Sequence, residues 1–179
     1  MCSLARADDG RLRLSAYAGL ADVYEEQNAS RNGPAFRVGA YYCLTKTFAV
    51  GTEVGYCDLG SDYTGCSDPG NPDCPQTYGY SAAHISIGGR VEPQTGRYPC
   101  PYLKVTTGFY RIGYKNQIRG VELDEESALG FGAALGVYRI WLLGMGVEAE
   151  WHTVRDTGDV LEGPGSNFYT LMLGVNLKR

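Results

Sequence analysis

Large apolar residues alternate with small or charged residues along most of this chain, at the period of two that indicates β-strands. In one stretch Phe131, Leu135 and Val137 occupy odd positions, while Gly130 and Gly132 occupy even positions. Convincing helical periodicity is absent, and no apolar run approaches the roughly 20 residues of a membrane-spanning helix. The chain is therefore expected to fold as an all-β protein.

The alternation predicts eight strands of about ten residues or more, the length that a tilted strand needs to cross a bilayer. The predicted strands are 11–24, 34–44, 48–59, 77–91, 100–114, 127–138, 142–154 and 168–178. Long and short connections alternate between these strands. The long ones are 25–33, 59–76, 115–126 and 155–167, and the shorter ones are 45–47, 92–98 and 139–141. Outer-membrane barrels show this asymmetry, with short periplasmic turns and long extracellular loops.

The charged residues share a face with the glycines, and the large apolar residues take the opposite face. In stretch 142–154, Glu148, Glu150 and His152 oppose Val147 and Trp151. A water-soluble barrel would place its large apolar side chains inside, so this pattern predicts a barrel with lipid around it and a polar lumen. A soluble calycin-like barrel of opposite register is the alternative, and it would be monodisperse without detergent. Aromatic residues near the strand ends are predicted to form two interfacial girdles: Tyr24, Tyr42, Phe48, Tyr56, Tyr78, Tyr102, Phe109, Trp141, Trp151, Phe168 and Tyr169.

The strand number, loop pattern and alternation from Arg11 to Arg179 resemble the OmpA-type and OmpX-type eight-stranded outer-membrane barrels, including opacity-like surface proteins. The last strand, from Phe168 to Leu177, resembles the insertion strand that ends such proteins. That strand normally ends on an aromatic residue, whereas here Lys178 and Arg179 follow Leu177. The resemblance implies a bacterial outer-membrane location, contact with outer-membrane lipids and lipopolysaccharide, and a monomer.

In the barrels that this chain resembles, acidic and basic side chains pair inside the lumen and plug it. The candidates here are Glu53, Glu148, Glu150, Lys104, Arg90, Arg37, Arg13, His84 and His152. The three glutamates are predicted near the middle of the barrel. Arg13, Arg90 and Lys104 are predicted nearer the periplasmic end, and Arg37 and His152 nearer the outside. Buried charges persist when they are paired and hydrogen-bonded, which favours a plug.

Three functions are compatible with this plan. The first is a non-enzymatic protein that acts through its surface loops, in envelope integrity, adhesion or binding of an extracellular macromolecule. The second is a narrow porin-like channel for ions or small solutes, which would conduct if the ion pairs exchange. The third is a lipid-modifying hydrolase, because His84 and Ser86 are similar to the H-x-S pair of outer-membrane lipid A deacylases. The residue that follows this pair is Ile87 instead of the usual Asn, and no catalytic residue is assigned.

The six cysteines and the N-terminus fit an exported protein. Cys66 and Cys74 bracket a segment rich in turn residues and are predicted to form a disulfide, with zinc binding as the weaker alternative. Cys43 and Cys57 face inward at opposite strand ends and are not expected to pair with each other, whereas Cys43 and Cys100 could bond across the lumen. The pattern Ala5-Arg6-Ala7 resembles the end of a signal peptide, so residues 1–7 are predicted to be its remnant and 8–179 one barrel domain.

Composition excludes some partners. The 16 Lys and Arg residues are outnumbered by 20 Asp and Glu, giving a formal charge of −4 and no basic stripe, so nucleic-acid binding is not expected. No spacing of acidic residues matches a metal-binding loop, and no cofactor or metal is predicted. The alternating glycines 130, 132, 136, 144 and 146 do not lie at a strand-to-helix turn and so do not form a nucleotide loop.

Overall fold

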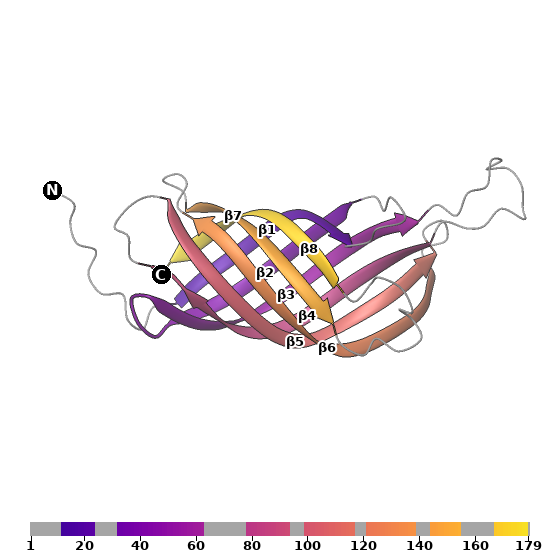
Figure 1. The fold of residues 1–179 in the computed structure, drawn as a ribbon, viewed down its shortest axis with the longest axis horizontal. Helices are drawn as coiled ribbons and strands as arrows, with labels where there is room; N and C mark the ends of the chain where they lie inside the picture. Colours follow the sequence, from indigo (N-terminus) through magenta and orange to yellow (C-terminus); the bar gives the residue numbers. More distant parts are fainter. Residues whose placement is uncertain are drawn as a thin grey trace, which may run out of the picture.

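The computed structural model describes residues 12–23, 32–62, 78–93, 99–116, 121–138, 144–154 and 167–178. They form eight β-strands that close into one antiparallel barrel, as the alternation predicted (Figure 1). The strands are β1 (Leu12–Val23), β2 (Gly33–Cys43), β3 (Phe48–Asp62), β4 (Tyr78–Val91), β5 (Cys100–Asn116), β6 (Val121–Tyr138), β7 (Met145–Val154) and β8 (Asn167–Lys178). The predicted eight-stranded up-and-down barrel is confirmed.

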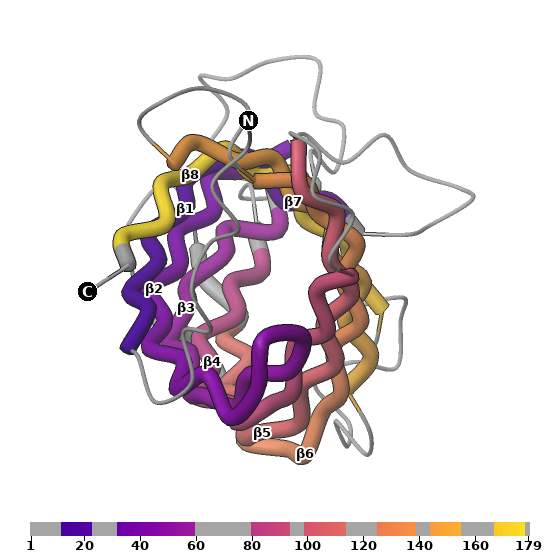
Figure 2. The backbone as a smooth tube through the Cα atoms, turned by 90° about the vertical axis from the view of Figure 1, so that its left-hand side faces the viewer, coloured from indigo at the N-terminus to yellow at the C-terminus, as the bar shows by residue number. Residues whose placement is uncertain are grey.

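Each strand pairs with its neighbours in sequence, and β8 closes the barrel by pairing with β1 from Arg13↔Lys178 to Val23↔Phe168. The view in Figure 2 shows the resulting ring of strands. The turn at residues 44–47, the start of β1 and the end of β8 all lie at one end of the barrel, called the turn end below. The opposite end, called the loop end, carries the connections that follow β1, β3, β5 and β7.

Local hydrogen bonds explain why the turn between β2 and β3 is tight. The Thr45 hydroxyl accepts hydrogen bonds from the backbone N–H groups of Thr47, at 3.2 Å, and of Phe48, at 3.0 Å. The N–H groups of Leu44 and Thr45 donate to the Phe48 carbonyl. A side chain that bonds the backbone two residues on favours a turn over a continued strand.

Gly144 enters β7 with a φ of 69°, in the left-handed region that glycine adopts most readily. Its carbonyl accepts a hydrogen bond of 2.9 Å from the N–H of Asn176 in β8. This hydrogen bond links the turn end of β7 to β8.

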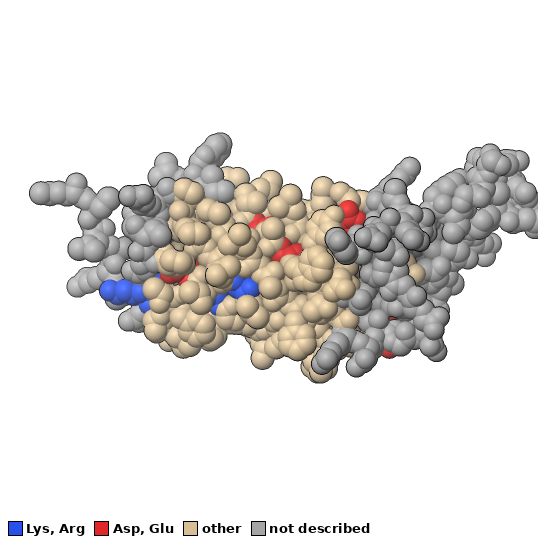
Figure 3. Space-filling model, in the orientation of Figure 1, with Lys and Arg blue, Asp and Glu red and all other residues tan. Residues whose placement is uncertain are grey.

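The two faces of the barrel wall divide as the alternation predicted. In β2 and β7, buried and exposed side chains alternate along almost the whole strand. The outward face carries large apolar residues such as Phe109, 64% exposed, and Leu173, 62% exposed. Most of the described surface on the side shown in Figure 3 carries no charged residue. A wall that exposes apolar side chains on its outer face and buries charges on its inner face is suited to a lipid environment.

Several predicted boundaries are wrong. The segment 115–126 was predicted as a long loop, but β5 runs to Asn116 and β6 begins at Val121. Continuous pairing from Arg111↔Ser127 to Tyr114↔Asp124 extends this hairpin. The acidic residues of 122–126 suggested a loop, but backbone pairing with β5 continues through this segment. β3 also extends past residue 59, to Asp62, and Gly144, predicted within the seventh strand, precedes β7, which begins at Met145. Residues 142 and 143 of that predicted strand lie outside the described residues.

Among the described residues, no helix is long and apolar enough to span a membrane. Residues 1–11, the segments 24–31 and 155–166, and the pair Cys66 and Cys74 lie outside the described residues.

Candidate functional site

The barrel lumen is filled by side chains because small residues in one strand make room for large ones in the next. A Cβ atom added to Gly136 of β6 would lie 2.2 Å from Cζ of Tyr102 in β5, and one added to Gly130 would lie 2.5 Å from Cδ2 of Tyr110. The glycines of β6 therefore leave space for inward-facing tyrosines. The buried tyrosines of the lumen are Tyr17, Tyr41, Tyr102, Tyr110 and Tyr138.

Five charged side chains meet in the middle of the lumen. This central charge cluster consists of Arg37, Glu53, Lys104, Glu148 and Glu150, and each is at most 3% exposed. The Lys104 ammonium lies 2.9 Å from carboxylate oxygens of Glu53 and Glu148, and 3.0 Å from Glu150. The Arg37 guanidinium forms ion pairs with the same three glutamates, including Nε to Glu53 Oε1 at 3.3 Å.

A second group of charges lies at the turn end. This turn-side cluster consists of Arg13, Arg90 and Glu92: Arg13 forms an ion pair with Glu92, and Arg90 Nε lies 2.7 Å from Glu92 Oε1. The hydroxyl of Tyr138 donates a 2.7 Å hydrogen bond to the other oxygen of Glu92. The backbone N–H of Glu92 donates to the Thr47 carbonyl at 2.8 Å, which fixes this residue beside the turn.

Polar contacts join the two clusters. The Arg90 guanidinium lies over the Tyr102 ring, 3.5 Å from its centroid, and the Tyr102 hydroxyl donates to Glu148 of the central charge cluster. The hydroxyls of Tyr17 and Tyr102 lie 3.2 Å apart, and Asn176 donates a 2.8 Å hydrogen bond to the Tyr17 hydroxyl. Side chains from β1, β4, β5, β7 and β8 are thereby linked across the lumen.

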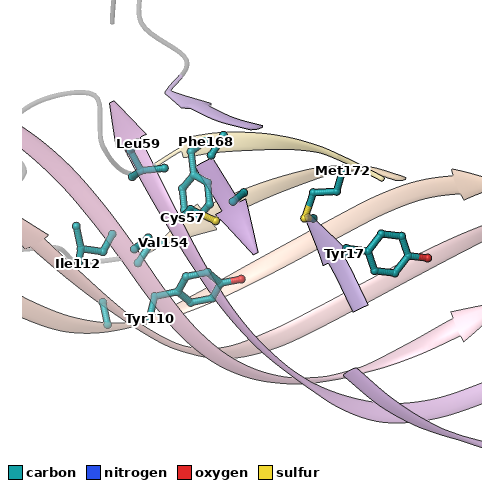
Figure 4. Close-up of a cluster of buried hydrophobic side chains, with 12 residues drawn as sticks. Tyr17, Cys57, Leu59, Tyr110, Ile112, Val154, Phe168 and Met172 are labelled. Atoms are coloured by element: carbon teal, nitrogen blue, oxygen red, sulfur yellow. The ribbon is translucent and has the colours of Figure 1, made fainter. Parts of the chain in front are cut away.

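An aromatic layer lies on the loop side of the central charge cluster. Its members are His84, Tyr110, His152 and Phe168: the rings of His152 and Phe168 stack at 4.4 Å, and those of His84 and Tyr110 at 5.0 Å. Tyr110 and His152 share a hydrogen bond of 3.0 Å, and His152 Nε2 lies 3.7 Å from Glu150 Oε2. Buried apolar residues continue this layer, and Figure 4 shows Leu59, Cys57 and Phe168 grouped together.

Charge balance explains how the lumen tolerates so many buried ions. The described residues bury four cationic and four anionic side chains of the Lys, Arg, Asp and Glu types, so their formal charges cancel. A buried ion is costly when it has no counter-ion, and ion pairs offset this cost when further hydrogen bonds support the groups. In the central charge cluster every ion has a counter-ion, and the Tyr102 hydroxyl adds a hydrogen bond to Glu148. The arrangement can close the lumen to water and solutes, because charge and aromatic rings occupy successive levels.

The structure places all nine residues of the predicted lumen network on the inner face, but not all at the predicted level. Lys104, predicted near the periplasmic end, and Arg37, predicted near the outside, both belong to the central charge cluster. Because the strands are tilted and offset from one another, residues of different strands reach the same height in the barrel. The sequence alone does not give this offset.

Sequence reasoning did not place Glu92, Tyr17, Tyr102 or Tyr110 in the lumen. Tyr102 and Phe168 were predicted to belong to the aromatic girdles, and this is wrong because they are 1% and 0% exposed. Their even numbers give them the same face as Lys104 and Thr170, so strict application of the period of two would have placed both inside. Tyr42, Phe48, Tyr56, Phe109, Trp151 and Tyr169 do face outward.

The pair proposed for a hydrolase has no catalytic geometry among the described residues. His84 and Ser86 both face the lumen and are buried. The Ser86 hydroxyl and His84 Nδ1 each lack a hydrogen-bond partner there, so the histidine is not bonded to the serine. An activated nucleophile needs a base within hydrogen-bond reach.

Two cysteines contribute thiols to the lumen. Cys43 and Cys57 are buried and free, so the bond that Cys43 and Cys100 could have formed across the lumen is not present. Within the described part of the chain, no group of three or more His, Cys, Asp or Glu side chains is placed to hold a metal ion.

Comparisons with known proteins find the same fold. Neisserial surface protein A is 15% identical, with a TM-score of 0.63 over 97% of this chain and 99% of that one. The attachment invasion locus protein Ail of Yersinia pestis is 13% identical, with a TM-score of 0.57 over 96% and 99%. A major outer membrane protein from Thermus thermophilus is 13% identical, with a TM-score of 0.53 over 94% and 99%. No family model matches the sequence, and no curated protein matches it.

The fold and the lumen define the class of this protein. It is an eight-stranded β-barrel of the bacterial outer-membrane type, with an apolar outer face and a charged, filled lumen. An apolar outer wall around a charged lumen is the architecture of barrels that lie in the outer membrane, the location that the sequence predicted.

Proposed function

We propose that this protein is a monomeric, non-conducting outer-membrane barrel that acts through the part of the chain beyond the loop end. The barrel would serve as a rigid anchor in the lipid, and contact with an extracellular macromolecule or with lipopolysaccharide would support adhesion or envelope integrity. The observation that carries this proposal is the central charge cluster, in which Lys104 and Arg37 form ion pairs with three glutamates from β3 and β7.

The same observation argues against a channel. An ion that crossed the lumen would have to break several buried ion pairs of the central charge cluster and then pass the stacked rings of His152 and Phe168. Each buried pair is expensive to break, because its partner is left without a counter-charge. An open porin keeps a water-filled lumen instead.

Planar-bilayer recording tests the closed lumen. We expect the refolded chain to insert without stable conductance steps. We expect the Lys104→Ala variant to show channel openings, because the ammonium that forms ion pairs with three glutamates of the central charge cluster is lost. The exposed turn variant Lys46→Ala is the matched control, and it should stay silent. Regular conductance of the unaltered chain would contradict the proposal and favour the narrow channel.

A second experiment tests the surface role. Bacteria that display the chain would be compared with bacteria in which residues 64–76 are replaced by a glycine-serine segment of equal length. We expect reduced attachment to host-cell matrix, while heat-modifiable gel migration shows that the barrel still folds. A structural neighbour, Ail, is named for attachment and invasion and is known in complex with a heparin analogue. Its low identity relates the two proteins by fold alone, so sulfated polysaccharide is one probe among several.

The hydrolase alternative receives no support from the site. His84 and Ser86 lie in the lumen, where lipid acyl chains do not reach, and they are not bonded to one another. A Ser86→Ala variant is therefore expected to leave outer-membrane lipid composition unchanged when the lipids are compared by mass spectrometry.

A further inference from the structure

The central charge cluster does not balance its own charges. Its two cations, Arg37 and Lys104, face three carboxylates, so its formal charge is −1. The charge that balances it in the lumen as a whole lies in the turn-side cluster, where two arginines contact one glutamate. Because an uncompensated charge is costly away from water, the central charge cluster favours a bound counter-ion of its own.

One carboxylate oxygen of the central charge cluster has no partner. Glu150 is 2% exposed, and its Oε2 atom forms the ion pairs with Arg37 and Lys104. Its other oxygen, Oε1, is buried and forms no hydrogen bond within the described part of the chain. Glu148 differs, because its Oε1 contacts Lys104 and its Oε2 accepts a hydrogen bond from Tyr102. The oxygen at which a counter-ion would bind is therefore Oε1 of Glu150.

This unpartnered oxygen lies against a glycine of β6, on which polar atoms from the neighbouring strands converge. A Cβ atom added to Gly132 would lie 2.8 Å from Oε1 of Glu150 and 2.5 Å from the hydroxyl oxygen of Thr106. It would also lie 3.4 Å from Nδ1 of His152. Thr170, which pairs with Glu150 in the ladder between β7 and β8, adds a buried hydroxyl that also lacks a hydrogen-bond partner among the described residues. This group of one carboxylate and two hydroxyls around Gly132 is called the Gly132 site below.

The neighbouring histidine does not supply the missing positive charge. Nδ1 of His152 shares a hydrogen bond with the Tyr110 hydroxyl, and Nε2 has no hydrogen-bond partner among the described residues. A protonated ring carries an N–H on both nitrogens, and a buried charged group that lacks an acceptor for one of them is costly. The 3.7 Å from Nε2 to Oε2 of Glu150 is longer than a hydrogen bond. This geometry suits a neutral ring, which leaves the charge of the cluster unbalanced.

We propose that the Gly132 site binds one small monovalent metal cation, sodium being the ion that we test. A single positive charge balances the central charge cluster, whereas a divalent ion would reverse the sign of its charge. Carboxylate and hydroxyl oxygens are ligands of hard cations, while soft metals prefer sulfur. The ion is a small one, because the oxygens lie close to the Gly132 backbone. This proposal goes beyond the proposed surface function, since it concerns the ion that completes the closed lumen.

Unfolding in different salts tests the proposal with the whole chain in lipid vesicles. An ion that binds only the folded barrel lowers the unfolding constant by a factor set by the ratio of its concentration to its dissociation constant. For a dissociation constant of about 30 mM, about 0.3 M sodium chloride should give an unfolding constant roughly tenfold lower than tetramethylammonium chloride of equal concentration. Caesium chloride should lower the constant less than sodium chloride does, because caesium is the larger ion. The equilibrium does not depend on the route by which the ion enters the lumen.

Two lumen variants test where the ion binds. Glu150→Gln keeps the shape of the side chain and balances the charges of the cluster, so it should make the unfolding constants in sodium and tetramethylammonium salts equal. Thr106→Val removes one hydroxyl oxygen without changing any charge and should reduce the sodium effect to about threefold or less. The matched control Glu125→Gln makes the same change at an exposed position of β6 and should keep the tenfold difference. Heat-modifiable migration of each variant shows that the barrel folds.

Three results would overturn the proposal. They are equal unfolding constants of the unaltered chain in sodium and tetramethylammonium salts, a sodium effect that persists in full in either lumen variant, and equal effects of sodium and caesium. An unfolding constant that ignores sodium but falls as the pH is lowered would assign the balancing charge to a proton, which also overturns the proposal. The proposed function fails separately, if the unaltered chain conducts in planar bilayers. A silent barrel that is equally stable in both salts would therefore refute the cation site alone.

Discussion

Lys104 is expected to contribute most to the stability of the closed lumen, and Lys104→Met is the substitution that measures this. Its ammonium contacts three carboxylates within 3.0 Å, and Lys104 as a whole is 2% exposed. Methionine keeps most of the side-chain volume and removes the charge. The central charge cluster would then hold Glu53, Glu148 and Glu150 against the single guanidinium of Arg37.

The expected cost follows from the uncompensated charge. Removing one partner of a buried ion pair costs about 3–5 kcal/mol in unfolding free energy, because a buried charge is left without its counter-ion. At about 1.4 kcal/mol for each factor of ten, this is a change of roughly two to three and a half powers of ten in the unfolding constant. The double variant Lys104→Met/Glu150→Gln removes one charge of each sign and should recover about 0.5–3 kcal/mol of this loss.

Urea unfolding of the refolded chain in lipid vesicles measures these free energies through tryptophan fluorescence, with the slope against urea showing whether each variant unfolds in the same manner. Lys46→Met, in the exposed turn, is the matched control and should change stability by no more than about 0.5 kcal/mol. A loss below about 1 kcal/mol for Lys104→Met would refute the view that this ion is buried and paired. No recovery in the double variant would show that charge balance is not the cause.

Three further substitutions test the two faces of the wall by the same unfolding measurement. Val105→Arg places a charge on the outer face next to Lys104 and should cost about 2–4 kcal/mol in lipid, and an unchanged stability would mean that this face is not in the bilayer. Tyr102→Phe removes the hydroxyl that donates to Glu148 and should cost about 1–3 kcal/mol, whereas a neutral effect would place water at that carboxylate. Gly136→Ala puts a methyl group 2.2 Å from the Tyr102 ring and should cost about 1–3 kcal/mol, and a stabilised variant would show that the ring moves freely.

The sequence could predict the barrel because its alternation is a local signal. In each strand, successive residues face the lumen and the outer surface in turn. In β7, Glu148 and Glu150 face the lumen, whereas Val147 and Trp151 lie on the outer face. Loop lengths also indicate the order of the strands. Two strands joined by a tight turn are adjacent and antiparallel, because the turn is too short to reach any other strand. Local signals therefore sufficed for the strand number, the topology and the faces.

The height of each inward side chain along the barrel axis depends on how far neighbouring strands are offset from one another. No local sequence pattern contains this offset. Lys104 and Arg37 reach the same glutamates although the sequence suggested different heights. Glu92 was assigned to a turn, yet the strand direction persists far enough to aim its carboxylate at Arg13 and Arg90. The extension of β6 to Val121 was missed because its acidic residues resemble a loop, and its pairing with β5 is a tertiary property.

The orientation of the wall is tested most directly with single tryptophans in lipid vesicles whose acyl chains carry bromine, a quencher of tryptophan fluorescence. In a background that lacks Trp141 and Trp151, one tryptophan is placed at each of two adjacent pairs in β5, Tyr102 with Leu103 and Phe109 with Tyr110. Leu103 and Phe109 are 58% and 64% exposed on the outer face, while Tyr102 and Tyr110 are 1% and 0% exposed in the lumen. We predict strong quenching at 103 and 109 and little at 102 and 110. The reverse pattern, or equal quenching at all four positions, would contradict an apolar outer wall around a closed, charged lumen.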